Sequence, residues 1–279
     1  MDGTFYVAPD LFTQLYTVHA EYHDQSFPLL YGLLPDKQQG TYERFLRLIS
    51  EAVEDQNVNF RPAEVKVDYE MAAIKAGHTT LPGTNVKGCL FHYGQCINRA
   101  VQRMGLSGAY RDPQQDNLLC WIRRIAGLPV VPLGQLDFVW GEVTLHASNI
   151  PQAAEMHRYV NTTWMDIGAR IPRGVWNPYD QIDQPRTTNA IEGWHNKVNR
   201  YVGKAHPNLY ELITFLKQED AVQTGEMNRL ELGGAPNPKK RRYINNERHI
   251  LRLRAEFENG QRDVMNYLDA VSHRLQHGF

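Results

Sequence analysis

Asp2-Gly3-Thr4-Phe5-Tyr6-Val7 is a strand-like run with a carboxylate at its head. A second strand-like run, Val65-Lys66-Val67-Asp68, ends in a carboxylate. A third carboxylate, Glu192, lies near the start of a predicted helix. Functional side chains gather at the ends of strands in α/β sheets. Two aspartates on strands followed by a glutamate on a helix therefore predict an α/β protein in which the three side chains converge.

The first third of the chain has the predicted order strand, strand, strand, helix, strand, helix, strand. These elements are expected at residues 4–7, 14–20, 27–34, 41–54, 63–68, 69–77 and 86–90, with a helix at 91–104. The order is typical of an RNase H-like mixed sheet with helices on both faces. A closing helix is expected at residues 192–201, and the residues before it read as helical. They predict an all-α insertion before the helix that carries Glu192.

This reading divides the chain into four parts. Residues 1–105 are the first part of the RNase H-like core, and residues 106–185 are the helical insertion. Residues 186–230 supply the closing helices of the core, and residues 231–279 form a helical, basic C-terminal tail.

Composition excludes several classes of protein. The chain has 279 residues and three cysteines, which are too few for a disulfide scaffold. No apolar run approaches the roughly 20 residues of a membrane span, and no signal-peptide pattern is present. We therefore expect no membrane association.

Positive charge is concentrated in two zones of a chain whose net charge is −1. Residues 186–206 hold four Lys and Arg against one Glu, and residues 237–254 hold seven against one. Localised basic zones favour contact with phosphates, although solvated helix faces give the same pattern. The candidate DNA-binding residues in these zones are Lys197, Arg200, Lys239, Lys240, Arg241 and Arg242.

Converging carboxylates suit divalent metal ions. Two Mg²⁺ ions about 3.5–4 Å apart can activate an attacking oxygen and stabilise a leaving oxygen in phosphodiester chemistry. Each residue also has a local alternative: Asp68 as a helix N-cap, Glu192 in a capping box with Asn189, and Asp2 as part of a frayed terminus. Their order and placement together favour a site.

A second cluster has the spacing of a metal site. Cys89 and His92 form a C-x-x-H pair, and Cys96 follows one helical turn later. A closed zinc site needs four ligands, and the chain offers no clear second pair. We favour packing or a supporting role close to the carboxylates, with zinc as the lesser alternative.

Six blocks of sequence carry a resemblance to a known family. They are DGTF (2–5), LYTVHA (15–20), PLLYGLLP (28–35), VDYEMAAI (67–74), GCLFHYGQ (88–95) and RTTNAIEGWHNK (186–197). In this order and spacing they resemble the transposase domain of Mutator-like elements (MULE), over residues 2–220.

The resemblance implies a DDE site made of Asp2, Asp68 and Glu192, bound Mg²⁺ or Mn²⁺, and cut-and-paste transposition of DNA. It places Cys89 and His92 close to that site. It also implies transposon-end and target DNA as partners, a homo-oligomer, and a nuclear location. Trp194 and His195, beside Glu192, are candidate contacts to DNA, while burial of Trp194 against the sheet is an equal alternative.

One departure from the family leaves the activity open. Family members carry a DNA-binding region ahead of this domain, whereas the chain begins one residue before Asp2. We therefore expect a domain truncated at its N-terminus. One hypothesis is a metal-dependent transposase catalytic domain, which the presence of all three carboxylates favours. The other is a domesticated, catalytically silent relative that binds DNA or protein as a regulator.

Overall fold

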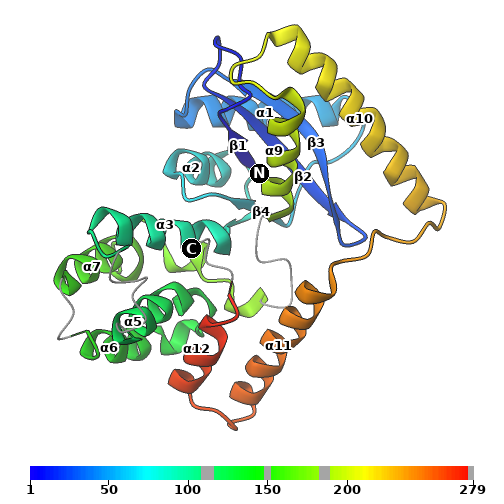
Figure 1. Cartoon of the computed structure of the whole chain (residues 1–279). Coiled ribbons are helices and arrows are strands. Elements are labelled where there is room, and N and C mark those ends of the chain that lie inside the picture. The colour runs from blue at the N-terminus through cyan, green and yellow to red at the C-terminus, as the bar shows by residue number, and fades with distance from the viewer. Residues whose placement is uncertain (108–115, 148–151, 182–188, 276–279) are drawn as a thin grey trace. The chain divides into compact units, whose positions relative to one another are not determined.

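The chain folds into two compact units. The computed structural model describes residues 1–107, 116–147, 152–181 and 189–275. The first unit consists of Met1–Val86 and Thr188–Pro238, and the second of Lys87–Thr187 and Lys239–Phe279. Strands and helices are both present, which confirms the predicted α/β class (Figure 1). The predicted boundary between residues 185 and 186 lies outside the described residues.

The strands of the first unit form two small sheets. Strands β1 (Asp2–Thr4), β2 (Gln14–Tyr22) and β3 (Gln25–Leu34) form an antiparallel meander, with β2 in the centre. Strands β4 (Glu64–Val67) and β5 (Asn85–Gly88) pair separately. The sequence led us to expect one mixed sheet. A hydrogen bond from the N-terminal ammonium of Met1 to the Lys66 carbonyl (2.7 Å) joins the start of the chain to β4.

Helices cover both faces of the meander. Successive side chains along β2 point to opposite faces, so each face presents residues against which a helix packs. Leu15 packs on one face in a cluster with residues of α9 (Asn189–Val202) and α10 (Leu209–Glu231). Its neighbour Tyr16 lies on the other face, where its ring centroid is 5.1 Å from that of Tyr42 in α1 (Gln39–Glu54). Helix α2 (Met71–Thr80) packs against α1.

A glycine on β3 permits the close approach of α1. A Cβ atom added to Gly32 would lie 2.6 Å from the Phe45 ring, which is closer than real Cβ contacts. Gly32 therefore lets the Phe45 ring of α1 pack directly on the backbone of β3.

The described residues of the second unit are almost entirely helical. The α-helices are α3 (Leu90–Arg103), α5 (Asp116–Gly127), α6 (Leu136–Leu145), α7 (Ala153–Val160), α8 (Arg173–Trp176), α11 (Arg241–Glu258) and α12 (Val264–Ser272). Short 3-10 turns η1 (Leu128–Val130), η2 (Leu133–Gln135) and η4 (Tyr179–Gln181) and a π-turn η3 (Asn161–Met165) connect them.

The C-terminal helices, which the sequence analysis set apart as a basic tail, pack within this second unit. Helix α12 lies against α5, and Arg124 of α5 donates two hydrogen bonds to Asp269 of α12, at 2.6 and 2.8 Å. The buried Tyr267 donates its hydroxyl hydrogen to the Val130 carbonyl (3.0 Å). Among the described residues, no helix is both long and apolar enough to cross a membrane.

Candidate active site

Asp2 is held firmly in the first unit. It lies in β1 directly opposite Thr17 of β2, and only 5% of its surface is exposed. Its Oδ1 atom accepts a hydrogen bond from the backbone nitrogen of Gly3 (2.8 Å). The alternative in which Asp2 belongs to a frayed end is therefore wrong, because pairing with β2 and burial fix its position.

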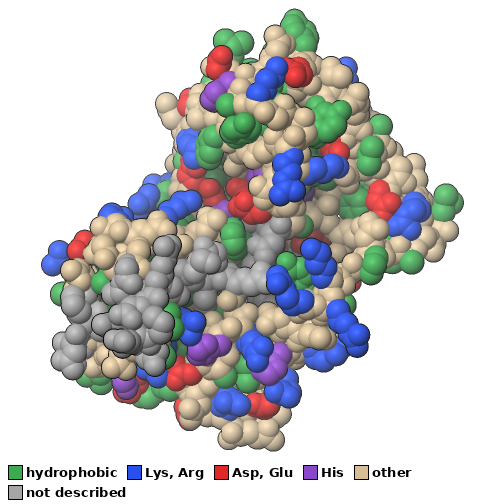
Figure 2. Space-filling view, in the orientation of Figure 1, with side chains coloured by type: hydrophobic (Ala, Val, Ile, Leu, Met, Phe, Trp, Pro, Cys, Tyr) green, Lys and Arg blue, Asp and Glu red, His purple; other side chains and the backbone are tan. Residues whose placement is uncertain are grey.

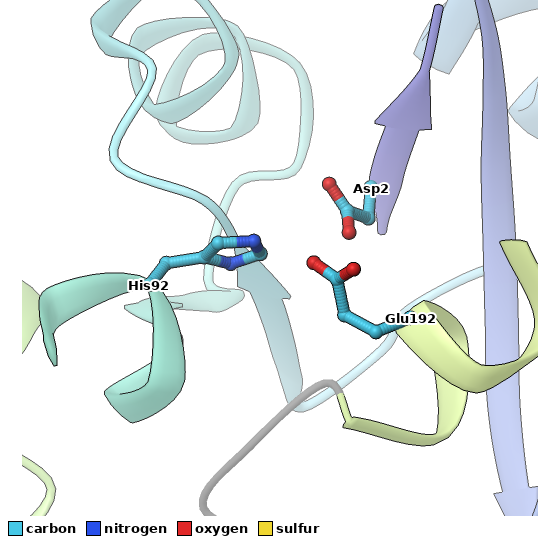
Figure 3. A group of neighbouring side chains, drawn as sticks. All are labelled: Asp2, His92 and Glu192. Carbon is cyan, nitrogen blue, oxygen red and sulfur yellow. The ribbon is translucent and has the colours of Figure 1, made fainter. Parts of the chain in front are cut away.

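Glu192 lies in the first turn of α9 and faces Asp2. Figure 3 shows the two carboxylates pointing toward one another from β1 and α9. An oxygen of Asp2 and an oxygen of Glu192 lie within 4.8 Å of each other, although the residues are far apart in sequence. Two negative charges at this distance repel, and the repulsion grows as water is removed. A cation or a shared proton would relieve it.

Asp68 follows β4 and lies in a turn. Its Oδ1 accepts a hydrogen bond from the backbone nitrogen of Glu70 (3.1 Å), and α2 begins one residue later, at Met71. Asp68 is thus two residues ahead of the N-cap position, so the alternative of Asp68 as the N-cap is wrong. The hydrogen bond uses Oδ1 and leaves Oδ2 for another ligand.

The buried Tyr16 is influenced by both aspartates. Burial raises the pKa of Tyr16, and the nearby charges of Asp68 and Asp2 contribute in the same direction. Asp68 and Asp2 therefore act on a common region of the first unit. Among the described residues, the carboxylate oxygens of Asp2, Asp68 and Glu192 do not all lie within 4.8 Å of one another.

Trp194 is a core residue of the first unit. It is 7% exposed, stacks on Tyr31 (ring centroids 5.6 Å apart) and meets the edge of His19 (5.4 Å). A ring buried in this way is not presented to a nucleotide for stacking. The assignment of Trp194 to DNA contact is therefore corrected, and its burial against the sheet is what the structure shows.

A buried carboxylate on α10 anchors α9. Glu219, 4% exposed, accepts hydrogen bonds from Trp194 Nε1 (3.1 Å) and from Lys197 Nζ (2.6 Å to Oε2). Burial acts to raise the pKa of Glu219, but the hydrogen bonds from Lys197, Gln223 and Trp194 outweigh it and hold the pKa below its usual value. This network fixes the helix that carries Glu192.

Sequence reasoning missed Glu219, although a signal was present. Leu212, Phe215, Leu216 and Glu219 follow the i, i+3, i+4, i+7 spacing of one helix face, and the first three are in the core. An acid on an apolar helix face predicts a buried partner, which here is the Trp194 and Lys197 pair.

His195 also points inward. It is 5% exposed, its Nε2 lies 3.3 Å from the hydroxyl of Thr17, and its Nδ1 lies 3.8 Å from Asp2 Oδ2. The assignment of His195 to DNA contact is corrected, because its ring is enclosed by β1, β2 and α9. Thr17 was not predicted as a site residue, since nothing distinguishes one threonine within a strand.

The outer face of α9 remains accessible. Lys197 keeps half of its side chain exposed while it pairs with Glu219. Together with Gly193, Asn196, Arg200 and Tyr201 it lines an open hollow of about 590 Å³. In the second unit, Lys239 and Lys240 immediately precede α11 and Arg241 and Arg242 begin it, and all four are exposed. Figure 2 shows Lys and Arg side chains distributed among acidic ones on the visible face.

Cys89 and His92 belong to the second unit, at the start of α3. Cys89 is buried. Within the described part of this unit, no three His, Cys, Asp or Glu side chains lie close enough to one another to hold a metal ion. The zinc alternative stays a prediction.

The donors of the first unit fit a hard divalent cation. Asp2 and Glu192 offer carboxylate oxygens, the ligands that Mg²⁺ and Mn²⁺ prefer. Their mutual repulsion in a largely buried setting is the condition that a bound cation would offset.

Comparison with known protein families gives one match. Residues 1–95 match the family model described as MULE transposase domain. The searches of curated proteins and of solved structures returned no match. The matched residues include Asp2 and Asp68 and end before Glu192. The match implies a transposase-related function, interaction with DNA and use of a divalent metal, and over residues 1–95 it confirms the predicted MULE transposase domain family.

Proposed function

We propose that this protein is a DDE-type transposase in which Asp2, Asp68 and Glu192 hold Mg²⁺ or Mn²⁺ for the cleavage and joining of DNA. The observation that carries the proposal is the approach of Asp2 and Glu192, whose carboxylate oxygens lie within 4.8 Å of each other. A purely structural role does not require two partly buried carboxylates to face each other.

The position of β4 supports Asp68 as the third member. The hydrogen bond from the amino terminus of Met1 to the Lys66 carbonyl places the start of β1 beside the end of β4, which Asp68 follows. We propose an RNase H-like fold for the first unit, in which β4 would extend the sheet beside β1, with the helical residues before Glu192 as an insertion.

Binding of a third carboxylate to the metal would draw the turn of Asp68 toward the other two. The bound metal ions would supply an activated oxygen nucleophile and stabilise the leaving oxygen. Asp2 and Glu192 would orient the reacting phosphate by fixing the ions between β1 and α9. Trp194 and Glu219 hold α9 against the sheet and so keep Glu192 in place.

The DNA partner follows from the same chemistry. We propose that Lys197 and Arg200 on α9, and the basic start of α11 from Lys239 to Arg242, contact DNA phosphates. Transposon ends and target DNA are the proposed substrates, a homo-oligomer the proposed assembly, and the nucleus the proposed location.

A nicking assay tests the proposed function. Supercoiled plasmid serves as a substrate that needs no knowledge of the terminal repeats, with Mg²⁺, Mn²⁺ or chelator present. We expect metal-dependent nicking by the wild type and none by Asp68→Asn or Glu192→Gln, which remove charge but little volume. Glu211→Gln, on the exposed part of α10, is the matched control and should nick normally. Nicking that survives Asp68→Asn or Glu192→Gln would overturn the assignment.

A silent, DNA-binding relative gives a different result. It would bind DNA, and neither metal nor the carboxylate variants would change the plasmid. The assay therefore separates the transposase from the domesticated regulator.

A further inference from the structure

Thr17 lies beside the backbone of Asp2. The two residues face each other across the antiparallel β1–β2 pair, and opposite residues in such a pair project on the same face. The Thr17 hydroxyl lies 3.2 Å from the Asp2 carbonyl oxygen and donates to it. Thr17 is fully buried, so water does not compete for this hydroxyl.

His195 completes a chain of hydrogen bonds. A hydroxyl has one hydrogen, and that of Thr17 is directed at the Asp2 carbonyl. Its oxygen can therefore accept from His195 Nε2, at 3.3 Å. The chain runs from α9, through β2, to the backbone of Asp2. It ties the helix that carries Glu192 to the strand that carries Asp2.

The Thr17 hydrogen bond is made to the backbone carbonyl of Asp2 and not to its carboxylate. On the carboxylate, Oδ1 accepts from the Gly3 nitrogen, and Oδ2 lies 3.8 Å from His195 Nδ1. The strand β1 has only three residues, and Asp2 is next to the repelling carboxylate of Glu192. The hydrogen bond from Thr17 to the Asp2 carbonyl supports the backbone of this short strand at the residue that carries the carboxylate.

We propose that Thr17 and His195 are positioning residues, which hold Asp2 at the distance from Glu192 that a divalent cation requires. This inference rests on the proposed metal-dependent function and deepens it. Neither residue is assigned a bond to the metal or to DNA. Partners that orient metal ligands typically contribute about 10–100-fold to metal affinity or activity.

Two matched pairs of variants test the proposal. Thr17→Val keeps the shape of the side chain and removes the hydroxyl, whereas Thr17→Ser keeps the hydroxyl. His195→Leu removes both nitrogens, whereas His195→Gln retains a donor near the place of Nε2. Mn²⁺ affinity is measured by calorimetric titration of the full chain, without DNA, and thermal unfolding is measured on the metal-free protein.

We expect Thr17→Val and His195→Leu each to weaken Mn²⁺ binding by about tenfold or more. Thr17→Ser and His195→Gln should bind within about threefold of the wild type. The double variant Thr17→Val/His195→Leu should lose little more than either single variant, because both changes break one chain. In the nicking assay the loss should appear as a higher Mn²⁺ requirement, with an unchanged apparent KM for DNA.

Two outcomes would overturn the proposal, and a control separates it from the function. If Thr17→Val and His195→Leu lower only the unfolding temperature while Mn²⁺ affinity stays at the wild-type value, the residues are structural and the positioning role is wrong. If Thr17→Ser and Thr17→Val weaken Mn²⁺ binding equally, the Thr17 hydroxyl and its hydrogen bonds do not position Asp2. Glu192→Gln is run alongside: Mn²⁺ binding that is insensitive to this change shows that the proposed metal site itself has failed.

Discussion

Replacing Glu192 by Gln should stabilise the metal-free protein. The substitution removes one of two negative charges whose oxygens lie within 4.8 Å, and it preserves the volume of the side chain. An ordinary helix residue behaves in the opposite way, because loss of a capping carboxylate costs stability. The sign of the change therefore distinguishes a metal site from a capping box.

The size of the effect follows from the separation of the charges. At 4.8 Å, the upper limit of the separation, Coulomb's law gives a repulsion of about 3.5 kcal/mol for an effective dielectric constant near 20 and about 0.9 kcal/mol for bulk water. Asp2 is buried and Glu192 is partly exposed, so the site lies between these limits. We expect the free energy of unfolding to rise by about 1 to 3 kcal/mol.

Urea unfolding in the presence of chelator measures this difference. Glu211→Gln is the matched control: its carboxylate pairs with Lys204 at 2.7 Å with both side chains about half exposed, and removing the pair should cost less than about 1 kcal/mol. Added Mn²⁺ should stabilise the wild type and leave Glu192→Gln unchanged. A lower free energy of unfolding for Glu192→Gln without metal would refute the reasoning, because it would make Glu192 a structural carboxylate.

Three further predictions concern other parts of the chain. Trp194→Ala should lower the free energy of unfolding by about 3–5 kcal/mol, as expected for a buried aromatic residue, and a decrease below about 1 kcal/mol in urea unfolding would contradict its place in the core. Burial, the Met1 amine and His195 together lower the pKa of His19 to about 3. The unfolded chain takes up this proton near its ordinary pKa of about 6.5 and the folded chain does not, so stability falls as the pH drops from about 6.5 toward 3, by at most about 1.4 kcal/mol per pH unit. The stability difference between wild type and His19→Leu, measured by urea unfolding, should be flat above pH 6.5 and shift against the wild type below it; a parallel pair of curves would show that His19 titrates normally. Neutralising Lys239, Lys240, Arg241 and Arg242 together should weaken DNA binding and reduce the salt dependence of log K by about one unit for each phosphate that these side chains no longer neutralise. A salt dependence of DNA binding equal to that of the wild type, measured by fluorescence anisotropy, would show that these side chains are solvated and do not contact phosphates.

The sequence predicted most of the elements because local patterns determine them. Strand-forming residues in β2 and β3 and the helical spacing of apolar residues in α1 predicted the main elements of the first unit. The predicted bounds agree with the observed ones to within a few residues. The division of the strands into two sheets was not predictable. It depends on how many hydrogen bonds join β1 to β4, which no local pattern encodes.

The candidate site was predicted in part. Asp2 and Glu192 were identified from their places at a strand and a helix, and the structure brings them together. The orientation of Trp194 and His195 was misread, since adjacent residues on a helix point about 100° apart and either face could have been the buried one. Glu219 and Thr17 escaped notice because their importance arises from partners distant in sequence.

The most direct test is a crystal structure of the protein soaked in Mn²⁺, with the metal located by its anomalous signal. We predict a peak bonded by oxygens of Asp2 and Glu192, with the turn of Asp68 drawn in as the third ligand. Well-defined density for all three carboxylates with no anomalous peak between them, at a Mn²⁺ concentration that supports binding in solution, would contradict the proposed DDE site.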